Sequence, residues 1–350
     1  MGAEPLNDCI GWDLGGAHIK AAWVREGEIR SVWQVSCPLW KGLDKLDQAL
    51  RKMLANLPSG CLHAVTMTGE MADLFSDRQQ GVDEILKTFV GITQTDPFLY
   101  VDKNIIPLSK ISFKNKKNLA SNNWQISQKW IAHRLSNALL VDIGSTTTDL
   151  APIIDGVPAC RGVTDKARLF HGELDYMGVV RTPLMALTRE ILFTGDWYPL
   201  MAEHFSTTAD IYRILGELSP HMDQADTPDG GPKTRSASMV RVARVLGADR
   251  ADAPDDAWWR IAAAFREIQL QRLTLDCLRQ LSRFGNRDVT LVGAGAGRFL
   301  LPEVARRLEI SYLDMARLFP CNEEFGVAFS PADCAPASAL ALLLDRQIRQ

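Results

Sequence analysis

Two segments of the sequence place an aspartate directly before a turn made of glycine and other small residues. The segment DLGGAHIK begins at Asp13, and DIGSTTTD begins much later, at Asp142. Because glycine carries no Cβ, the backbone N–H groups of such a turn can approach a phosphate closely. Each aspartate supplies the oxygen ligands that Mg²⁺ prefers. These segments therefore indicate the binding of a phosphate group together with a divalent cation.

A third segment, VGAGAG, adds a glycine-rich turn late in the chain. Alone it is weak evidence for nucleotide binding, and the lack of a following βαβ unit argues against a Rossmann domain. We expect Asp13 and Asp142 to bind Mg²⁺. The predicted phosphate-binding residues come from the three turns and from the lysine that follows the first turn: Gly15, Gly16, Lys20, Gly144, Ser145, Thr146, Thr147, Gly293 and Gly295. For a single turn, a hairpin that merely prefers glycine is an equally good interpretation.

The elements around these turns read as two copies of one strand-and-hairpin unit. Residues 8–35 form a predicted antiparallel meander, and residues 137–154 repeat its first hairpin. A long amphipathic helix is predicted at 256–281, whereas residues 200–235 lack periodicity and are predicted to form a mobile insertion. We therefore expect an α/β protein of two lobes, 1–137 and 138–331, with a C-terminal helix at 332–350 that packs back on the first lobe.

Composition narrows the class of protein. The 350 residues carry a formal net charge of -3 without a long basic tract, so nucleic acid is not an expected partner. The seven cysteines stand singly, with no CxxC pair, and suggest neither a disulfide framework nor a zinc site. Neither a secretory leader nor a run long enough to span a membrane is evident, so we expect a cytoplasmic protein with no membrane partner.

The order and spacing of DLGG, DIGSTTTD and VGAGAG resemble the phosphate and nucleoside motifs of the sugar kinase/actin superfamily. That resemblance implies a two-lobed, RNase H-like fold with a duplicated mixed sheet and a cleft between the lobes. A closer resemblance covers nearly the whole chain and is carried by GGAHIK, TMTGEMAD, DIGSTTTD, TDKARLFHGELDYMGVVRTP and KTRSASMVRVARVLGAD. These segments are similar to the hydantoinase/oxoprolinase-related proteins of the tetrahydromethanopterin-linked one-carbon pathway.

The closer resemblance implies an enzyme of methanofuran or methylofuran biosynthesis. It would be an Mg²⁺-dependent transferase that joins an aminomethylfuran-methyl diphosphate to a γ-glutamyltyramine and releases diphosphate. Its partners would be these small molecules, and the sequence leaves open whether it forms a homodimer. A phenol with a pKa of about 10 needs a base or a cationic neighbour to attack near neutral pH. The candidate catalytic residues are Glu70, Glu173, Asp149 and Lys166, with Asp175 as a further carboxylate.

Arg168 and Arg181 are candidates to bind the diphosphate or the glutamyl carboxylates, although a solvated surface charge is an equally good interpretation of each. Two other classes of function remain. The same turns would serve an ATP-dependent kinase or an amidohydrolase of the hydantoinase/oxoprolinase type. They would also serve a nonenzymatic scaffold whose lobes close on a nucleotide. The segment Gly16-Ala17-His18 departs from the GxT pattern that sugar kinases commonly use, which argues modestly against a sugar kinase.

Overall fold

The computed structural model describes residues 8–101, 103–111, 119–321 and 329–350. The chain groups into two compact units: unit 1 comprises Met1–Ala138, Ile153–Cys160 and Asp314–Gln350, and unit 2 comprises Leu139–Pro152 and Arg161–Leu313. The predicted second lobe had included residues 153–160 and 314–331, which group with unit 1 instead. Side-chain contacts explain the difference: the rings of Phe319 and Trp130 stack with their centroids 5.7 Å apart, and Gln128 Nε2 donates to Cys160 Sγ over 3.4 Å.

Unit 1 is built on a mixed six-stranded sheet. Its order is β3-β2-β1-β4-β5-β6, with β1–β2–β3 an antiparallel meander, β1–β4 and β4–β5 parallel, and β5–β6 antiparallel. Strand β1 is buried along its whole length because helices cover both faces of the sheet. The bounds are β1 (Cys9–Leu14), β2 (His18–Arg25), β3 (Glu28–Ser36), β4 (Leu62–Met67), β5 (Phe98–Val101) and β6 (Asn104–Pro107).

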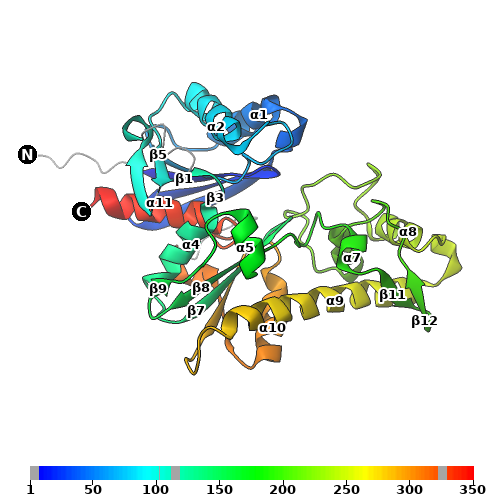
Figure 1. Cartoon of the computed structure of the whole chain (residues 1–350). Coiled ribbons are helices and arrows are strands. Elements are labelled where there is room, and N and C mark those ends of the chain that lie inside the picture. Colours follow the sequence, from blue (N-terminus) through cyan, green and yellow to red (C-terminus); the bar gives the residue numbers. More distant parts are fainter. Residues whose placement is uncertain (1–7, 102, 112–118, 322–328) are drawn as a thin grey trace, which may run out of the picture. The chain divides into compact units, whose positions relative to one another are not determined.

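Helices α1 (Leu43–Leu54) and α2 (Arg78–Thr93) lie on one face of this sheet, and α11 (Ala335–Ile348) lies on the other with α4 (Asn123–Ala132) packed beside it (Figure 1). The close approach of α11 explains Gly11 on β1, because a Cβ there would overlap the backbone of Ala337. Asp77 starts α2 by accepting a hydrogen bond from the backbone N–H of Gln80. Helix α11 at the end of the chain thus packs on strands from its beginning.

Unit 2 repeats this arrangement around a second sheet. The order is β10-β8-β7-β13-β14, and β9, whose residues group with unit 1, pairs with Ile153 and Ile154 at the end of β8. As in unit 1, the strand that ends in Asp-x-Gly lies between its hairpin partner and a strand from much later in the chain, so the predicted duplication is confirmed. The bounds are β7 (Ala138–Ile143), β8 (Thr148–Ile154), β9 (Val157–Pro158), β10 (Leu174–Asp175), β13 (Thr290–Ala294), β14 (Ser311–Asp314), α5 (Asp165–His171) and α10 (Leu301–Leu308).

The rest of unit 2 packs around the first half of the long helix α9 (Asp255–Leu281), which Figure 1 shows running from this region to the sheet. Trp258, Ile261 and Phe265 of α9 centre a separate apolar core. Pro254 directly precedes the helix, and its fixed φ suits the start of a helix. The other elements of this region are α6 (Leu184–Leu187), β11 (Glu190–Phe193), β12 (Asp196–Pro199), α7 (Thr208–Leu215) and α8 (Arg235–Val245).

Residues 200–235 are ordered rather than the mobile insertion that the sequence suggested. They contain α7, and buried ion pairs hold the loop that follows it. Asp210 is fully buried and accepts from Arg213 over 2.9 Å and from Arg241 over 2.8 Å. Asp223 in turn lies 2.6 Å from Arg213. Breaking such a network would leave buried charges without partners, which costs about 3 to 5 kcal/mol, so the loop stays in place.

Short 3₁₀ helices complete the chain at Leu39–Lys41, Leu108–Lys110, Arg250–Asp252, Arg298–Leu300 and Met315–Leu318. No helix of the described ranges has both the length and the apolar character that crossing a bilayer demands.

Candidate active site

The two aspartate-glycine turns have the same backbone geometry. In unit 1 the N–H of Gly15 donates to the carbonyl of His18 over 3.0 Å, and in unit 2 the N–H of Gly144 donates to the carbonyl of Thr147 over 2.8 Å. Each bond closes a tight loop at the tip of a hairpin. In unit 2 the next two N–H groups, those of Ser145 and Thr146, have no acceptor within the described residues. Adjacent N–H groups of this kind form a concave site for an anion.

The same holds in unit 1, where no acceptor among the described residues takes the N–H groups of Gly16 and Ala17. The carbonyls of this turn are occupied, since Gly16 accepts from Leu39 over 3.0 Å and Ala17 accepts from Cys37 over 2.8 Å. The segment that directly follows β3 thus holds this turn in place through two backbone hydrogen bonds. Both turns therefore have a backbone arrangement that could accept an anion, and phosphate binding there stays a prediction.

The segment after β10 holds the second turn in place. The N–H groups of Val180 and Arg181 donate to the carbonyl of Ser145 over 3.1 and 2.9 Å. A Cβ on Gly178 would lie 2.5 Å from the peptide that joins Ser145 to Thr146, so only glycine allows this packing. Sequence reasoning missed Gly178, although a lone glycine in the run MGVVRTP is a signal for such a close backbone approach.

Arg181 also brings a cation to this turn. Its Nη1 lies 3.4 Å from Thr146 Oγ1, and the side chain is half-buried. Burial lowers the pKa of the Arg181 guanidinium, which nevertheless stays charged at any physiological pH. A positive charge beside two adjacent N–H groups suits an oxyanion, as the sequence predicted for this residue.

The glycine-rich third segment packs on the strand that carries Asp142. A Cβ on Gly295, whose φ is +79°, would overlap Asp142 Oδ1 and the carbonyl of Ile143. The N–H of Gly297 donates to that same carbonyl over 2.8 Å. Gly295 therefore lies beside the predicted metal ligand. Gly293 does not, because a Cβ there would meet the side chains of Tyr312 and Leu301, so its glycine serves packing rather than phosphate binding.

In unit 1 the first aspartate lies among polar side chains from three elements. Asp13 is 6% exposed, and Asn123 Nδ2 at the start of α4 lies 3.5 Å from its Oδ2. Lys20 stands opposite Asp13 in the β1–β2 register, on the same face of the sheet. Glu70 is 1% exposed and accepts from Ser121 Oγ over 2.6 Å.

Ser121 and Asn123 escaped the sequence analysis. Their only signal is the polar run SNN directly before the buried Trp124, which follows a stretch with weak periodicity. They position the two carboxylates of unit 1 from a helix start that lies far from both in sequence.

Three predicted residues form a buried ion cluster that stabilises unit 2. Glu173 is fully buried and accepts from the backbone N–H groups of Arg161 (2.7 Å) and Gly162 (2.8 Å) and from Arg283 (3.1 Å). Arg168 is 2% exposed and lies 2.8 Å from Asp149. With its acceptor positions filled, Glu173 is poorly placed to take a proton from a substrate, and Arg168 and Asp149 neutralise each other. The expected catalytic and substrate-binding roles do not suit this geometry.

Lys166 is exposed on α5, two positions before Arg168 of this cluster in the sequence. Asp175, the further candidate base, pairs with Arg272 over 2.6 Å. Burial, then the charge of Asp175, raises the pKa of the neighbouring Asp276 to about 6. A hydrogen bond between the two carboxyl groups, which needs a shared proton, adds to the rise.

Comparison with known proteins gives this site its context. The family model described as hydantoinase/oxoprolinase matches residues 62–330. The chain belongs to the hydantoinase/oxoprolinase family. A relative in Methanocaldococcus jannaschii, named (4-{4-[2-(gamma-L-glutamylamino)ethyl]phenoxymethyl}furan-2-yl)methanamine synthase, is 30% identical over 342 residues, covering 97% of this chain and 98% of its own.

A protein of the same name in Methanococcus vannielii is also 30% identical, over 214 residues that cover 61% of this chain and 92% of its own. Among solved structures, a ROK family glucokinase from Streptomyces griseus, in complex with glucose and AMPPNP, matches with a TM-score of 0.48 at 15% identity and covers 97% of this chain and 100% of its own. The two mixed sheets of the hydantoinase/oxoprolinase chain give it the α/β architecture with a duplicated sheet that the sequence predicted.

Proposed function

We propose that this protein is an enzyme of methanofuran-type cofactor biosynthesis that forms an aryl ether. The observation that carries the proposal is the identity of 30% across 97% of the chain with the relative in Methanocaldococcus jannaschii. The name of that relative describes a product in which a phenoxymethyl bridge joins a furan to a glutamylated aminoethylphenyl group. A tyramine phenol and a furanylmethyl carbon are the two halves of such a bridge.

The reaction that we propose displaces diphosphate. The phenol oxygen of a γ-glutamyltyramine forms a bond to the furanylmethyl carbon, while the bond from that carbon to the diphosphate oxygen breaks. The phenol proton passes to a base, and the aminomethylfuran-methyl diphosphate loses its diphosphate as an anion. ATP is not required, because the furan substrate already carries its leaving group.

The phosphate turns support a diphosphate as the leaving group. The adjacent N–H groups of Ser145 and Thr146, with Arg181 beside them, offer donors where negative charge grows as the bond breaks. Preorganised donors of this kind contribute about 3 to 4 kcal/mol each to many transition states. The turn at Gly16 and Ala17 offers a second pair of N–H groups of the same geometry.

Mg²⁺ is a suitable cofactor for these residues because it needs only one or two protein carboxylates. Within the described residues no three His, Cys, Asp or Glu side chains gather to hold a metal by themselves. Mg²⁺ characteristically binds through one or two carboxylates together with water and substrate phosphates. Asp13 in unit 1 and Asp142 in unit 2, each beside its own turn, are the proposed ligands, and Mg²⁺ when bound would neutralise charge on the departing diphosphate.

Glu70 is the base that this geometry favours. It is buried near the end of β1, in the same unit as the first turn, and accepts from Ser121 Oγ. Ser121 would hold the Glu70 carboxylate in one orientation as it takes the phenol proton. Lys20, across from Asp13, would add positive charge near the first turn.

The deciding experiment measures diphosphate release by the purified protein. We expect release only when Mg²⁺, γ-glutamyltyramine and the aminomethylfuran-methyl diphosphate are all present, and the aryl ether should appear in equal amount. ATP with Mg²⁺ is the parallel control. Phosphate released from ATP, with nothing from the furan diphosphate, would instead assign a kinase or an ATP-dependent amidohydrolase.

The metal ligands are tested by Asp13→Asn and Asp142→Asn, which keep shape and remove charge. Each should lower kcat by about 100-fold or more, because metal neutralisation of a transition state is worth several kcal/mol. Thermal midpoints within a few degrees of the parent would show that both variants fold. Undiminished Mg²⁺-dependent turnover in both would remove the metal from the proposal.

A further inference from the structure

Four buried polar side chains of unit 2 take no part in the reaction proposed above, yet they gather around one peptide, that of Gly178. They are Thr182, Thr208 and Tyr212 of α7, and Gln269 of α9, and none is more than 5% exposed. Burying a polar group costs free energy unless it is hydrogen-bonded, so the partners of these side chains are informative. We call the four residues the Gly178 network.

The network holds the backbone of Gly178 from both sides. The N–H of Gly178 donates to Thr182 Oγ1 over 2.8 Å. Its carbonyl accepts from Thr208 Oγ1 over 3.0 Å and from Gln269 Nε2 over 3.2 Å, which fills both lone pairs of that oxygen. The backbone therefore cannot rotate at this residue without breaking buried hydrogen bonds.

Tyr212 determines how Gln269 is oriented. The Tyr212 hydroxyl donates to Gln269 Oε1 over 2.6 Å, which leaves the Nε2 end of the amide facing the Gly178 carbonyl. Burial, then the charge of Glu217, raises the pKa of Tyr212. The hydroxyl thus keeps its proton and remains a donor throughout the physiological range of pH.

The residues that follow Gly178 transmit this fixed position to the second turn. The N–H of Val179 donates to the carbonyl of Gly144 over 3.1 Å, and those of the next two residues donate to the carbonyl of Ser145 over 3.1 and 2.9 Å. Because a trans peptide is planar, the carbonyl of Gly144 and the N–H of Ser145 point in opposite directions in one plane. The carbonyl of Ser145 and the N–H of Thr146 are related in the same way. Holding the two carbonyls therefore sets where the two N–H groups point.

Tyr212 also contacts the third glycine-rich segment. Its ring meets that of Phe299 edge to face, with the centroids 5.2 Å apart, in the short 3₁₀ helix directly after Gly297. The N–H of Gly297 donates to the carbonyl of Ile143 over 2.8 Å, and a Cβ on Gly297 would lie 2.7 Å from Val179 Cγ1. Tyr212 thus joins the two segments that pack against the end of β7.

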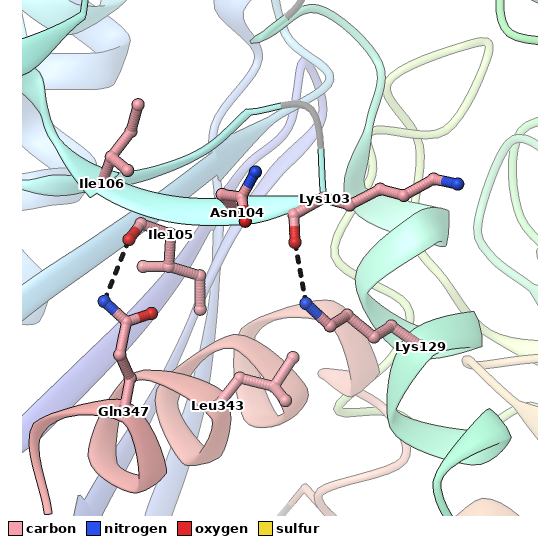
Figure 2. A pocket seen from close by; sticks show the side chains of 7 residues that line it. All are labelled: Lys103, Asn104, Ile105, Ile106, Lys129, Leu343 and Gln347. Atoms are coloured by element: carbon pink, nitrogen blue, oxygen red, sulfur yellow. Dashed lines mark hydrogen bonds between the residues drawn. The ribbon is translucent and has the colours of Figure 1, made fainter. Parts of the chain in front are cut away.

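Side chains that donate to backbone carbonyls also occur in unit 1, where they serve the edge of its sheet. Figure 2 shows a hollow of about 360 Å³ in which Lys129 Nζ donates to the carbonyl of Lys103 over 2.7 Å and Gln347 Nε2 to that of Ile105 over 3.1 Å. Strand β6 is the last strand of its sheet, so these bonds satisfy carbonyls at its open edge. The Gly178 network differs because its bonds end beside an anion-binding turn.

We propose that the Gly178 network positions the second turn for the diphosphate of the substrate. It acts through the Gly178 peptide on the N–H groups of Ser145 and Thr146, which are the proposed donors. Donors that are held in place before the substrate arrives need not reorient as negative charge grows on the leaving group. The inference rests on the proposed function and adds the side chains that preorganise its leaving-group site.

The test is calorimetric titration of the whole chain with sodium diphosphate in the presence of Mg²⁺. Tyr212→Phe removes the hydroxyl and keeps the ring against Phe299, while Thr208→Val removes the other hydroxyl at nearly constant volume. Thr208→Ser restores that hydroxyl. The matched control is Thr227→Val, because Thr227 Oγ1 donates to the carbonyl of Gly231 over 2.8 Å in the same unit. A dissociation constant, unlike a rate, does not depend on the fraction of protein that is folded.

We expect Tyr212→Phe and Thr208→Val each to weaken diphosphate binding about 10-fold, as the loss of one buried hydrogen bond would. Thr208→Ser and Thr227→Val should bind with parental affinity. Parental affinity in both Tyr212→Phe and Thr208→Val would overturn the inference. Equal weakening in Thr227→Val, or a parent protein that binds no diphosphate, would overturn it as well.

Hydrogen exchange supplies a readout that needs no ligand. The amides of Val180 and Arg181, which donate to the second turn, should exchange about 10-fold faster in Tyr212→Phe, while those of β13 keep parental rates. Equal rates for Val180 and Arg181 in variant and parent would contradict the inference. A parent protein that binds inorganic diphosphate but releases none from the furan substrate would refute the proposed reaction alone.

Discussion

Arg181 is the single residue on which the leaving-group proposal depends most directly. Its guanidinium lies 3.4 Å from Thr146 Oγ1 beside the second anion-binding turn. We expect Arg181→Met to lower kcat/KM for the furan diphosphate by about 10- to 100-fold, because a hydrogen bond to a charged group is worth about 1.5 to 3 kcal/mol. Steady-state kinetics with varied furan diphosphate measures this.

The control for that variant is Arg189→Met, an exposed arginine of the same unit. Its kinetics should match those of the parent, and the thermal midpoints of both variants should stay within a few degrees of it. Equal rates for Arg181→Met and the parent protein would assign Arg181 to the fold alone.

Asp276 gives unit 2 a dependence of stability on pH. Its pKa is raised from 3.8 to about 6, first by burial and then by Asp175. A raised pKa in the folded state means that the contribution to stability is complete below pH 3.8 and is lost as pH rises through about 6. Asp276→Asn should therefore raise the free energy of unfolding above pH 7. The gain is about 1 kcal/mol once solvent screening of this partly exposed group is allowed for.

Urea unfolding at pH 4 and pH 7.5 measures that change. The gain from Asp276→Asn should be present at pH 7.5 and close to absent at pH 4. Gains of equal size at both values would show that Asp276 is not the titrating group.

For individual residues, the sequence could indicate candidates for the site but not the side chains that contact them. DIGSTTTD predicted Ser145 and Thr146 because its glycine and small hydroxyl residues follow a strand and repeat the pattern of DLGG earlier in the chain. Glu173 and Arg168 stand in an equally promising segment, yet each is buried with partners on Arg161, Arg283 or Asp149. Which carboxylate keeps an open position is decided by long-range packing, and the local pattern carries no record of it.

At the scale of elements, the close packing of α11 on β1 offers a strict test of the fold. A Cβ on Gly11 would overlap the backbone of Ala337 and lie 2.7 Å from the backbone N of Ala341. We expect Gly11→Val to cost about 3 kcal/mol or more, because overpacking against backbone leaves no side chain free to move aside. Hydrogen exchange should show lost protection in β1, β2 and α11 together.

The control is Gly91→Ala on α2 of the same unit, where a Cβ would meet nothing within 4 Å. That change should stabilise the unit by about 0.5 to 1 kcal/mol, because alanine is the better helix former. Similar protection in Gly11→Val and the parent protein would mean that α11 can shift without cost.

Elements with a regular pattern of apolar residues were predictable from the sequence. Elements held by ion pairs between residues far apart in the sequence were not. The meander, the repeated hairpin and the long helix α9 follow from alternation, turn glycines and the apolar stripe. Residues 200–235 carry no period, and their order comes from Asp210 and Asp223 binding arginines on α7 and α8. The short strand β10 likewise exists because it pairs with β8, which its own two residues could not indicate.

For the whole molecule, the decisive feature is that unit 1 is discontinuous in sequence. The chain leaves it after residue 138, re-enters it for residues 153–160, and returns to it at residue 314. Every residue from Ala335 to Asp345 is buried, so α11 supplies part of the core that β1, β2 and β4 need. A chain cut after Asp333 would expose that face of the sheet to water, at about 25 cal/mol for each Å² of apolar surface.

We therefore expect the chain cut after Asp333 to lose unit 1 while unit 2 keeps its own core around Trp258 and Phe265. Hydrogen exchange should show β1, β2 and β4 unprotected and α9 still protected. A chain cut after Ile348 is the control, and it should match the parent because it keeps the whole of α11. Because unit 1 carries Asp13 and Glu70, the shorter chain should also lack any diphosphate-releasing activity. Retained protection in β1 without α11 would show that unit 1 folds from its N-terminal segment alone.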